Sequence, residues 1–214
     1  MLEFIPSELP RPPARVLEVG CGSGELATAL ADGGYDVLAI DPEAPDGPLF
    51  RRTRIEDFDS TETFDAVIAK LSLHHVTDLA VALDKVVDVL SGEGRVVIDD
   101  FGWERLNERS AEDVGIRFDE WQDEHEHLHT AEAMLTELDE RFVRRTFSWE
   151  PFLFRESTPR PWRGARAEAD CQGSPSRPRL PVRRGTLTLR STHGRARRHR
   201  ARTGGDQGPA GLGP

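Results

Sequence analysis

Three glycines stand at every second position between Gly20 and Gly24, at the end of the apolar run Arg15–Gly20. A glycine loop that joins a buried strand to a helix lets a ligand approach the backbone closely, and the first turn of the helix offers free N–H groups. Asp41 follows the next apolar run, where its carboxylate is placed to accept hydrogen bonds from both hydroxyls of a ribose. We therefore expect an adenosine-containing ligand beyond the carboxyl ends of these two strands.

The spacing of the glycines distinguishes two classes of adenosine-containing ligand. A dinucleotide-binding loop has the pattern G-x-G-x-x-G, whereas this loop reads Gly20-x-Gly22-x-Gly24. Glu18 stands two residues before the first glycine, where a dinucleotide site has an apolar strand residue. A carboxylate there suits an ammonium group better than a pyrophosphate. The spacing favours S-adenosylmethionine, and the dinucleotide of an oxidoreductase stays the alternative.

Apolar runs that alternate with amphipathic segments indicate the elements that position this loop. We expect helices over 24–34 and 79–90, the second capped by Asp78, and a charged, mostly helical section over 104–129. The expected strands are Arg15–Gly20, Tyr35–Ile40, Arg54–Ile55, Phe64–Leu71, Arg95–Ile98 and Phe142–Phe154. This order predicts an α/β fold with a Rossmann-like, mostly parallel sheet flanked by helices, whose final strand is not evident after Phe154.

Four motifs occur in order between residues 14 and 100: VLEVGCGSGELATAL, VLAIDPE, FDAVIAKLSLHHV and LDKVVDVLSGEGRVVI. In motif order and spacing the chain resembles the class I S-adenosylmethionine-dependent methyltransferases of the small-molecule type. The resemblance implies a Rossmann-like domain, S-adenosyl-L-methionine as cofactor, and transfer of its methyl group to a small-molecule acceptor. A protein that binds the cofactor but is catalytically inactive or truncated is the second hypothesis.

The resemblance also implies where the cofactor contacts the chain. The glycine loop would surround the methionine part, Asp41 would hold the ribose, and two short segments would border the adenine and the methionyl group. The residues so implied are Glu18, Gly20, Cys21, Gly22, Gly24, Asp41, Ile55, Glu56, Asp57, Ala69, Lys70 and Leu71. Two positions depart from the family. Arg54 stands near the place of the usual adenine-side acid, and Lys70 puts a cation where a small residue is usual.

Methyl transfer is a direct displacement at an activated carbon, so alignment of the two reactants supplies much of the rate. A base is needed only when the acceptor must lose a proton, and His74 or His75 could be that base. The alternative is that both histidines are helix-entry residues that fill the floor of the pocket. Asp99, Asp100 and Trp103 follow the next strand and also face this edge, with Trp103 either an acceptor wall or part of the core.

The segment 125–129 matches the zinc-protease pattern H-E-x-x-H. We expect no metal site here, because the match falls at the end of a helical stretch and Thr130 is suited to cap the next helix. A role in acceptor binding and a solvated helix face stay the alternatives for these residues.

The charge of the chain changes sign near Ser157. From Thr158 onward there are 13 Arg, no Lys and three acids, a net charge of +10, which leaves −20 for residues 1–157, given −10 for the whole chain. We therefore expect a methyltransferase-like cofactor-binding domain over 1–157 and a disordered basic tail over 158–214. Three origins of the tail stay open: a frameshifted translation, a native disordered extension and a nucleic-acid-binding extension. In the first, codons that can encode RLPVRRG read one base later as GFRYVG, which is typical of a final strand.

Composition limits the compartment and the partners. The two cysteines make neither a disulfide framework nor a metal cluster, and the first 13 residues lack the regions of a signal peptide. No apolar run approaches the ~18 residues of a membrane span. We therefore expect a cytoplasmic protein with a small-molecule partner. We expect neither membrane nor nucleic acid as a partner, because the charge of −20 opposes encounter with nucleic acid.

Overall fold

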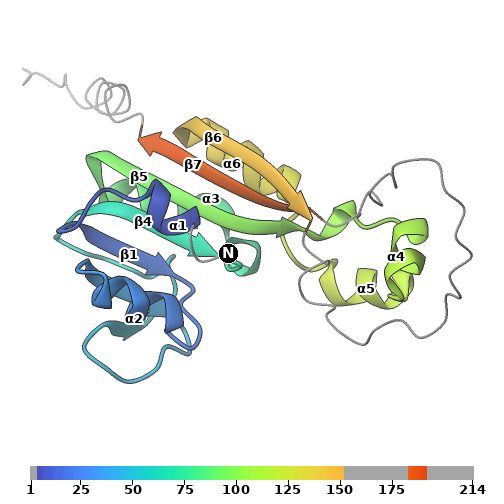
Figure 1. Ribbon diagram of the computed structural model, residues 1–214, viewed down its shortest axis with the longest axis horizontal. Coiled ribbons are helices and arrows are strands. Elements are labelled where there is room, and N and C mark those ends of the chain that lie inside the picture. Colours follow the sequence, from blue (N-terminus) through green and yellow to red (C-terminus); the bar gives the residue numbers. More distant parts are fainter. Residues whose placement is uncertain (1–3, 152–182, 192–214) are drawn as a thin grey trace, which may run out of the picture.

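Apolar segments form a seven-stranded sheet with helices on both sides in the computed structural model, which describes residues 4–151 and 183–191 (Figure 1). The strands are β1 (Arg15–Val19), β2 (Asp36–Asp41), β3 (Phe50–Arg52), β4 (Phe64–Lys70), β5 (Leu90–Gly102), β6 (Phe142–Pro151) and β7 (Arg183–Ser191). Their order across the sheet is β3-β2-β1-β4-β5-β7-β6, and β7 runs antiparallel to both of its neighbours. The expected Rossmann-like, mostly parallel sheet is confirmed.

Helices cover both faces because the central strands are apolar on both sides. The helices are α1 (Phe4–Glu8), α2 (Glu25–Asp32), α3 (Leu79–Val89), α4 (Glu108–Val114), α5 (Phe118–His125) and α6 (Ala131–Arg141), with 3-10 turns η1 (Leu73–His75) and η2 (Trp103–Arg105). Val16 of β1 packs in the core that contains α1 and α2, whereas Leu17 packs in the core that contains α3 and α6. Successive residues of one strand thus serve the two sides of the sheet.

Short-range signals set the helix ends as expected. The Asp78 side chain accepts a hydrogen bond from the N–H of Val81 at 3.0 Å, and Thr130 accepts one from the N–H of Ala133 at 3.1 Å. α2 ends just before the glycine pair 33–34. The caps fix where α3 and α6 begin, and the glycine pair ends α2 just before the start of β2.

The third strand needs a correction. We expected it at Arg54–Ile55, but β3 is Phe50–Arg52 and pairs with the last three residues of β2. β2 ends at Asp41, which is in register with Arg52, so the chain after Arg52 has no partner with which to continue the ladder. Ile55 is apolar because its side chain is buried beneath a turn.

The final strand also needs a correction, because residues 183–191 form β7 between β5 and β6. Leu187 and Leu189 are buried on one face, and on the other the buried Thr188 donates from Oγ1 to Oε2 of Glu8 at 2.9 Å. This alternation of leucine and threonine is short and lies in a stretch rich in Arg, Pro and Gly. That composition predicts disorder, so the strand was not predicted from the sequence. The rest of the expected tail lies outside the described residues. The boundary near Ser157 and the three origins of the tail stay predictions.

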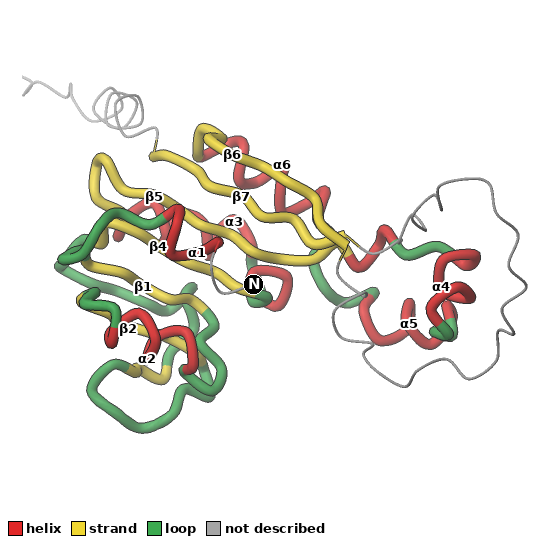
Figure 2. Tube along the Cα trace, viewed as in Figure 1, coloured by secondary structure: helices red, strands yellow, loops and turns green. Residues whose placement is uncertain are grey.

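Beyond the carboxyl end of β5, the helices α4 and α5 form a group beside the sheet (Figure 2). Their packing centres on the buried side chains of Phe101, Trp103, Leu106 and Ala111. The expected helical section over 104–129 is confirmed. Phe118 and Trp121 of this section pack with Phe101 and Trp103 into an aromatic cluster beyond the end of β5.

Among the helices of residues 4–151, none is both long and apolar enough to cross a membrane. The cytoplasmic location expected from the sequence stays a prediction.

Candidate functional site

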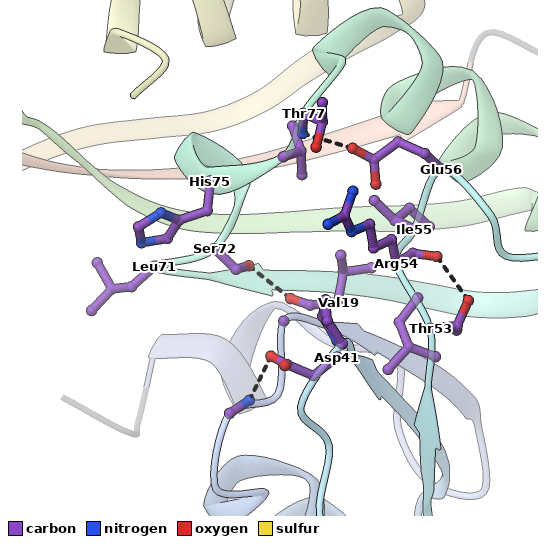
Figure 3. Close-up of a pocket in the computed structure, with 15 residues that line it drawn as sticks. Val19, Asp41, Thr53, Arg54, Ile55, Glu56, Leu71, Ser72, His75 and Thr77 are labelled. Carbon is purple, nitrogen blue, oxygen red and sulfur yellow. Dashed lines mark hydrogen bonds between the residues drawn. The ribbon is translucent and has the colours of Figure 1, made fainter. Parts of the chain in front are cut away.

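A cleft of about 360 Å³ opens at the carboxyl ends of β1, β2 and β4, on either side of the point where the strand order reverses (Figure 3). Ligands of open α/β sheets bind at this place. Of the expected site residues, the cleft brings together Gly20, Gly22, Asp41, Ile55, Glu56, Leu71 and His75. The expected residues that do not line it are Glu18, Cys21, Gly24, Asp57, Ala69, Lys70 and His74.

The three glycines of the loop have positive φ angles for different structural reasons. A Cβ atom on Gly20 would collide with the side chain of Ser72, and one on Gly24 would lie 2.5 Å from the ring of Phe50. A Cβ atom on Gly22 would meet no atom within 4 Å, although its φ of +49° is itself unfavourable for other residues. Gly22 therefore borders open space in the cleft, whereas Gly20 and Gly24 are required by contacts within the protein.

Glu18 is a buried acid with an unsatisfied oxygen. The residue is 3% exposed on β1, and its Oε2 has no hydrogen-bond partner within the described part of the chain. Burial raises the pKa of Glu18 to about 7, and the positive charge of Lys70 at the end of β4 opposes this rise. An ammonium group next to Oε2 would supply the missing partner and favour the ionised form.

Asp41 is held in place by the backbone at the end of β2. Its Oδ2 accepts a hydrogen bond from the N–H of Gly22 at 3.1 Å (Figure 3). Its Oδ1 accepts one from the N–H of Glu43 at 2.8 Å. Each carboxylate oxygen has a further lone pair, so both can still accept a hydrogen bond from a hydroxyl. The carboxylate lines the cleft and fits the role of a ribose acceptor.

The segment after β3 forms the other end of the cleft. Oε1 of Glu56 accepts hydrogen bonds from the N–H groups of Thr77 at 2.7 Å and Asp78 at 3.3 Å, which ties this segment to the start of α3. The side chain of Arg54 points into the same end of the cleft (Figure 3). This end therefore carries an acid that is engaged with the backbone and a cation.

Leu71 lines the cleft in an unusual backbone conformation. Its φ is +52°, the only positive φ of a residue other than glycine in the described ranges, and a bulky side chain rarely adopts it. The N–H of Leu71 donates to the carbonyl of Asp99 at 2.8 Å, which holds the turn against β5. Strain of this kind is common at functional sites. After this turn, the chain that follows β4 continues along the wall of the cleft.

Two residues expected near the cofactor have buried side chains, and their contact with it stays a prediction. Ala69 is 3% exposed on β4 and Cys21 is 7% exposed after β1. Burial raises the pKa of the Cys21 thiol to about 11, so the thiol stays protonated and is a poor nucleophile.

The structure separates the two histidines that the sequence left equivalent. His75 lines the cleft, whereas His74 is 3% exposed and its Nδ1 donates to Oδ1 of Asp100 at 2.5 Å. The two imidazole rings lie 4.1 Å apart between centroids. Burial, together with the neighbouring His74, lowers the pKa of His75. His75 is therefore the histidine of the pair that borders the cleft, and His74 is buried against Asp100.

The H-E-x-x-H segment does not present two histidines on one helix face. α5 ends at His125, whose Nδ1 donates to the carbonyl of Trp121 at 2.8 Å, and His129 donates from Nε2 to the carbonyl of Val76 at 2.9 Å. No cluster of three or more metal-ligating side chains occurs in residues 4–151 and 183–191. Trp103 is 8% exposed and donates from its indole to the carbonyl of His129 at 3.3 Å, so its ring belongs to the packed cluster.

Sequence reasoning did not single out Ser72, Val76 and Thr77, although all three line the cleft. Ser72 donates from Oγ to the carbonyl of Val19 at 2.7 Å and so joins the turn after β4 to β1. All three follow a central strand at the same sheet edge as the glycine loop, and that position is the signal that could have identified them.

Comparison with known sequences places the chain among methyltransferase domains. The profile of a family described as "Methyltransferase domain" matches residues 2–141. The chain is also similar to the ubiquinone biosynthesis O-methyltransferase of Bradyrhizobium sp. (strain ORS 278), with 33% identity over 97 residues that cover 39% of this chain and 38% of that protein. The match thus spans about two fifths of the length of this relative.

Solved structures share the fold. A SAM-dependent methyltransferase from Methanosarcina mazei superposes with a TM-score of 0.59 at 16% identity, over 88% of this chain and 96% of that one. The 1,6-didemethyltoxoflavin-N1-methyltransferase of Burkholderia thailandensis, with bound 1,6-didemethyltoxoflavin and S-adenosylhomocysteine, gives a TM-score of 0.53 at 17% identity over 84% and 72% of the two chains. At these identities the likeness concerns the fold.

Proposed function

Because the chain belongs to the methyltransferase-domain family, we propose that it transfers a methyl group from S-adenosyl-L-methionine to a small-molecule acceptor. The observation that carries the proposal is the cleft, which joins an open glycine, a backbone-held carboxylate and a histidine in one space. The second hypothesis, a cofactor-binding protein without activity, is not favoured. The described sheet includes β7, the strand that a truncated domain would lack.

The described residues fit S-adenosyl-L-methionine, which supplies a methyl group activated by a sulfonium when it is bound. Glu18 does not line the cleft itself, but it lies two residues before the glycine loop and its unsatisfied buried oxygen can accept from an ammonium group that reaches it, while Gly22 leaves room beside the backbone. Asp41 has free lone pairs for the ribose hydroxyls. In this arrangement the glycine loop binds the methionine part and the end of β2 binds the ribose.

At the acceptor end, His75 is the group placed to accept a proton. Its lowered pKa keeps the imidazole neutral at neutral pH, so the ring can take a proton from an acceptor hydroxyl. Leu71 and His75 both line the cleft, and Leu71 also packs against the aromatic cluster of Phe101 and Trp103. We infer that the acceptor enters between the cofactor and this cluster. An acceptor whose attacking atom is nucleophilic without first losing a proton, such as a neutral amine, needs no base.

A methyl-transfer assay on the full chain tests this function. The purified protein would be incubated with S-adenosyl-L-methionine carrying a labelled methyl group and a panel of small phenols, amines and carbon acids. Phenols come first because the relative from Bradyrhizobium is named as an O-methyltransferase. Asp41→Ala should weaken cofactor affinity by about tenfold or more, through the loss of charge-assisted hydrogen bonds.

Asp46→Ala is the matched control, because Asp46 lies in the same loop with its side chain 94% exposed and does not line the cleft. Label in an organic product, lost in Asp41→Ala and kept in Asp46→Ala, would support the proposal. Cofactor binding without transfer to any acceptor would instead support the inactive alternative. A folded chain that does not bind the cofactor would overturn both.

A further inference from the structure

Two opposite charges lie on neighbouring strands beside the glycine loop, and the positive one has no role in the function proposed above. Glu18 is on β1 and Lys70 is the last residue of β4, and these two strands are paired in parallel (Figure 1). Leu71, the residue after Lys70, lines the cleft. Lys70 therefore stands at the border of the ligand space, on the strand next to the one that leads into the glycine loop.

Strand alternation puts the side chains of Glu18 and Lys70 on the same face of the sheet. Val16 and Ile68 pack in the core that contains α1 and α2, and the two charged residues follow them by two positions on their strands. Glu18 is in register with Ile68, so Lys70 lies one pleat further toward the carboxyl ends of the strands. The charge of Lys70 acts on Glu18, because it opposes the rise in the pKa of that carboxyl.

The two charges do not pair with each other. Oε2 of Glu18 has no hydrogen-bond partner and the ammonium group of Lys70 forms no ion pair within the described ranges. Glu18 is 3% exposed and Lys70 is half-buried, so both charges are partly removed from water, which is unfavourable when no partner replaces the water. The two side chains therefore offer an acceptor and a donor to a ligand that carries charges of both signs.

The methionine part of the cofactor carries an ammonium group and a carboxylate on one carbon atom. The ammonium group needs an acceptor, and the carboxylate needs donors such as the three N–H groups of a lysine. We propose that Lys70 binds this carboxylate while Glu18 binds the ammonium group, so that the two residues together select a ligand with an intact amino-acid end. This step rests on the proposed function, because it assumes that the site holds the cofactor of the family.

Calorimetric titration of the full chain with two ligands tests the role of Lys70. One is S-adenosylhomocysteine, and the other is its decarboxylated analogue, in which hydrogen replaces the carboxylate. Both contain a neutral thioether, so repulsion between Lys70 and a sulfonium does not enter the comparison. The wild-type chain should bind S-adenosylhomocysteine about tenfold or more tightly than the analogue, as expected for a charge-assisted hydrogen bond. Lys70→Met should reduce this preference to within about threefold, mainly by weakening the binding of S-adenosylhomocysteine.

Lys85→Met is the matched control, because Lys85 pairs with the exposed Asp59 on α3's outer side of the chain and does not line the cleft. It removes the same charge and should leave the preference for the carboxylate unchanged. Lys70→Gln also removes the charge but keeps a polar end, and it provides the same comparison if Lys70→Met does not fold.

A preference of about tenfold that survives the loss of the Lys70 charge would overturn the proposal and assign the carboxylate to the N–H groups of the glycine loop. Wild-type affinities for the two ligands within about threefold of each other would also overturn it. Binding of neither compound to the folded wild-type chain would overturn the proposed function as well, so the two failures are distinguishable.

Discussion

Around the cleft, some residue types are required by contacts within the protein and others border the ligand space. At Gly20 the side chain of Ser72 fills the space that a Cβ atom would need. At Gly22 a Cβ atom would meet no protein atom and would point into the open space of the cleft. Glu18 is buried without a partner for one oxygen, which is costly in a protein with no ligand bound. A residue that is unfavourable for the fold alone indicates a ligand contact, and among residues 4–151 and 183–191 Glu18 is such a residue.

The raised pKa of Glu18 predicts how pH changes the stability of the ligand-free protein. The carboxyl titrates near 4.5 in the unfolded chain and at about 7 in the folded protein. Below 4.5 it is protonated in both states, and between these values only the folded state keeps the proton, so the fold loses stability as pH rises. Relative to wild type, Glu18→Gln should gain about 2–3 kcal/mol in free energy of unfolding between pH 5 and pH 8.

Urea unfolding at the two pH values, without cofactor, measures this difference. Glu25→Gln removes one carboxylate from an exposed position of α2 and is the control for net charge. A constant difference between Glu18→Gln and wild type across this pH range would contradict the buried, unpartnered carboxylate.

At the scale of elements, one buried acid joins η1 to β5 behind the cleft. Asp100 on β5 accepts from the N–H groups of Leu73 and Phe101, and from the backbone and the imidazole of His74. These bonds fix η1 against β5, and η1 in turn presents His75 to the cleft. Asp100 thus positions His75 without lining the cleft itself.

Asp100→Asn should lower both stability and turnover more than cofactor affinity. An amide nitrogen in place of one carboxylate oxygen would face either two backbone N–H groups or one backbone N–H and the imidazole, all of them donors, which should cost about 3 kcal/mol of unfolding free energy. A displaced His75 should lower turnover by about tenfold or more. Urea unfolding, titration with S-adenosylhomocysteine and the transfer assay measure the three effects, with the exposed Asp88→Asn on α3 as control. Equal losses of affinity and turnover would count against a positioning role.

At the scale of the whole molecule, β7 completes the sheet from a distant part of the chain. It fills the space between β5 and β6, and without it both strands would expose unpaired edges. The acidic domain expected over 1–157 is therefore not sufficient for the described sheet, since β7 lies beyond it. A chain cut after Ser157 would be a poor preparation for any binding experiment.

Leu189→Ala should show whether β7 belongs to the folded protein in solution. Leu189 is fully buried, and its truncation should lower the free energy of unfolding by about 3 kcal/mol through lost burial and a cavity. Val143→Ala on the neighbouring strand β6 is the control, because Val143 is 57% exposed. Equal stability of the two variants in urea unfolding would show that residues 183–191 do not pack in the sheet.

Much of the fold and the outline of the site could be predicted from local patterns. Apolar periodicity identified the strands β1, β2 and β4, and capping residues placed α3 and α6. The glycine loop and Asp41 were assigned to one edge because parallel strands bring their carboxyl ends together. The short edge strand β3 was misplaced and β7 was missed, because neighbouring strands stabilise both and neither has a strong pattern of its own.

The sequence by itself determined the α/β class, the glycine loop and the type of ligand, because these depend on residues that are close together in the chain. The tertiary structure alone decided that His75 and not His74 faces the cleft, that Ser72 excludes a side chain at Gly20, and that Arg54 lines the same cleft as Asp41. These facts depend on pairs of residues far apart in sequence. Strand register and crossover connections bring such pairs together, and no local pattern encodes them.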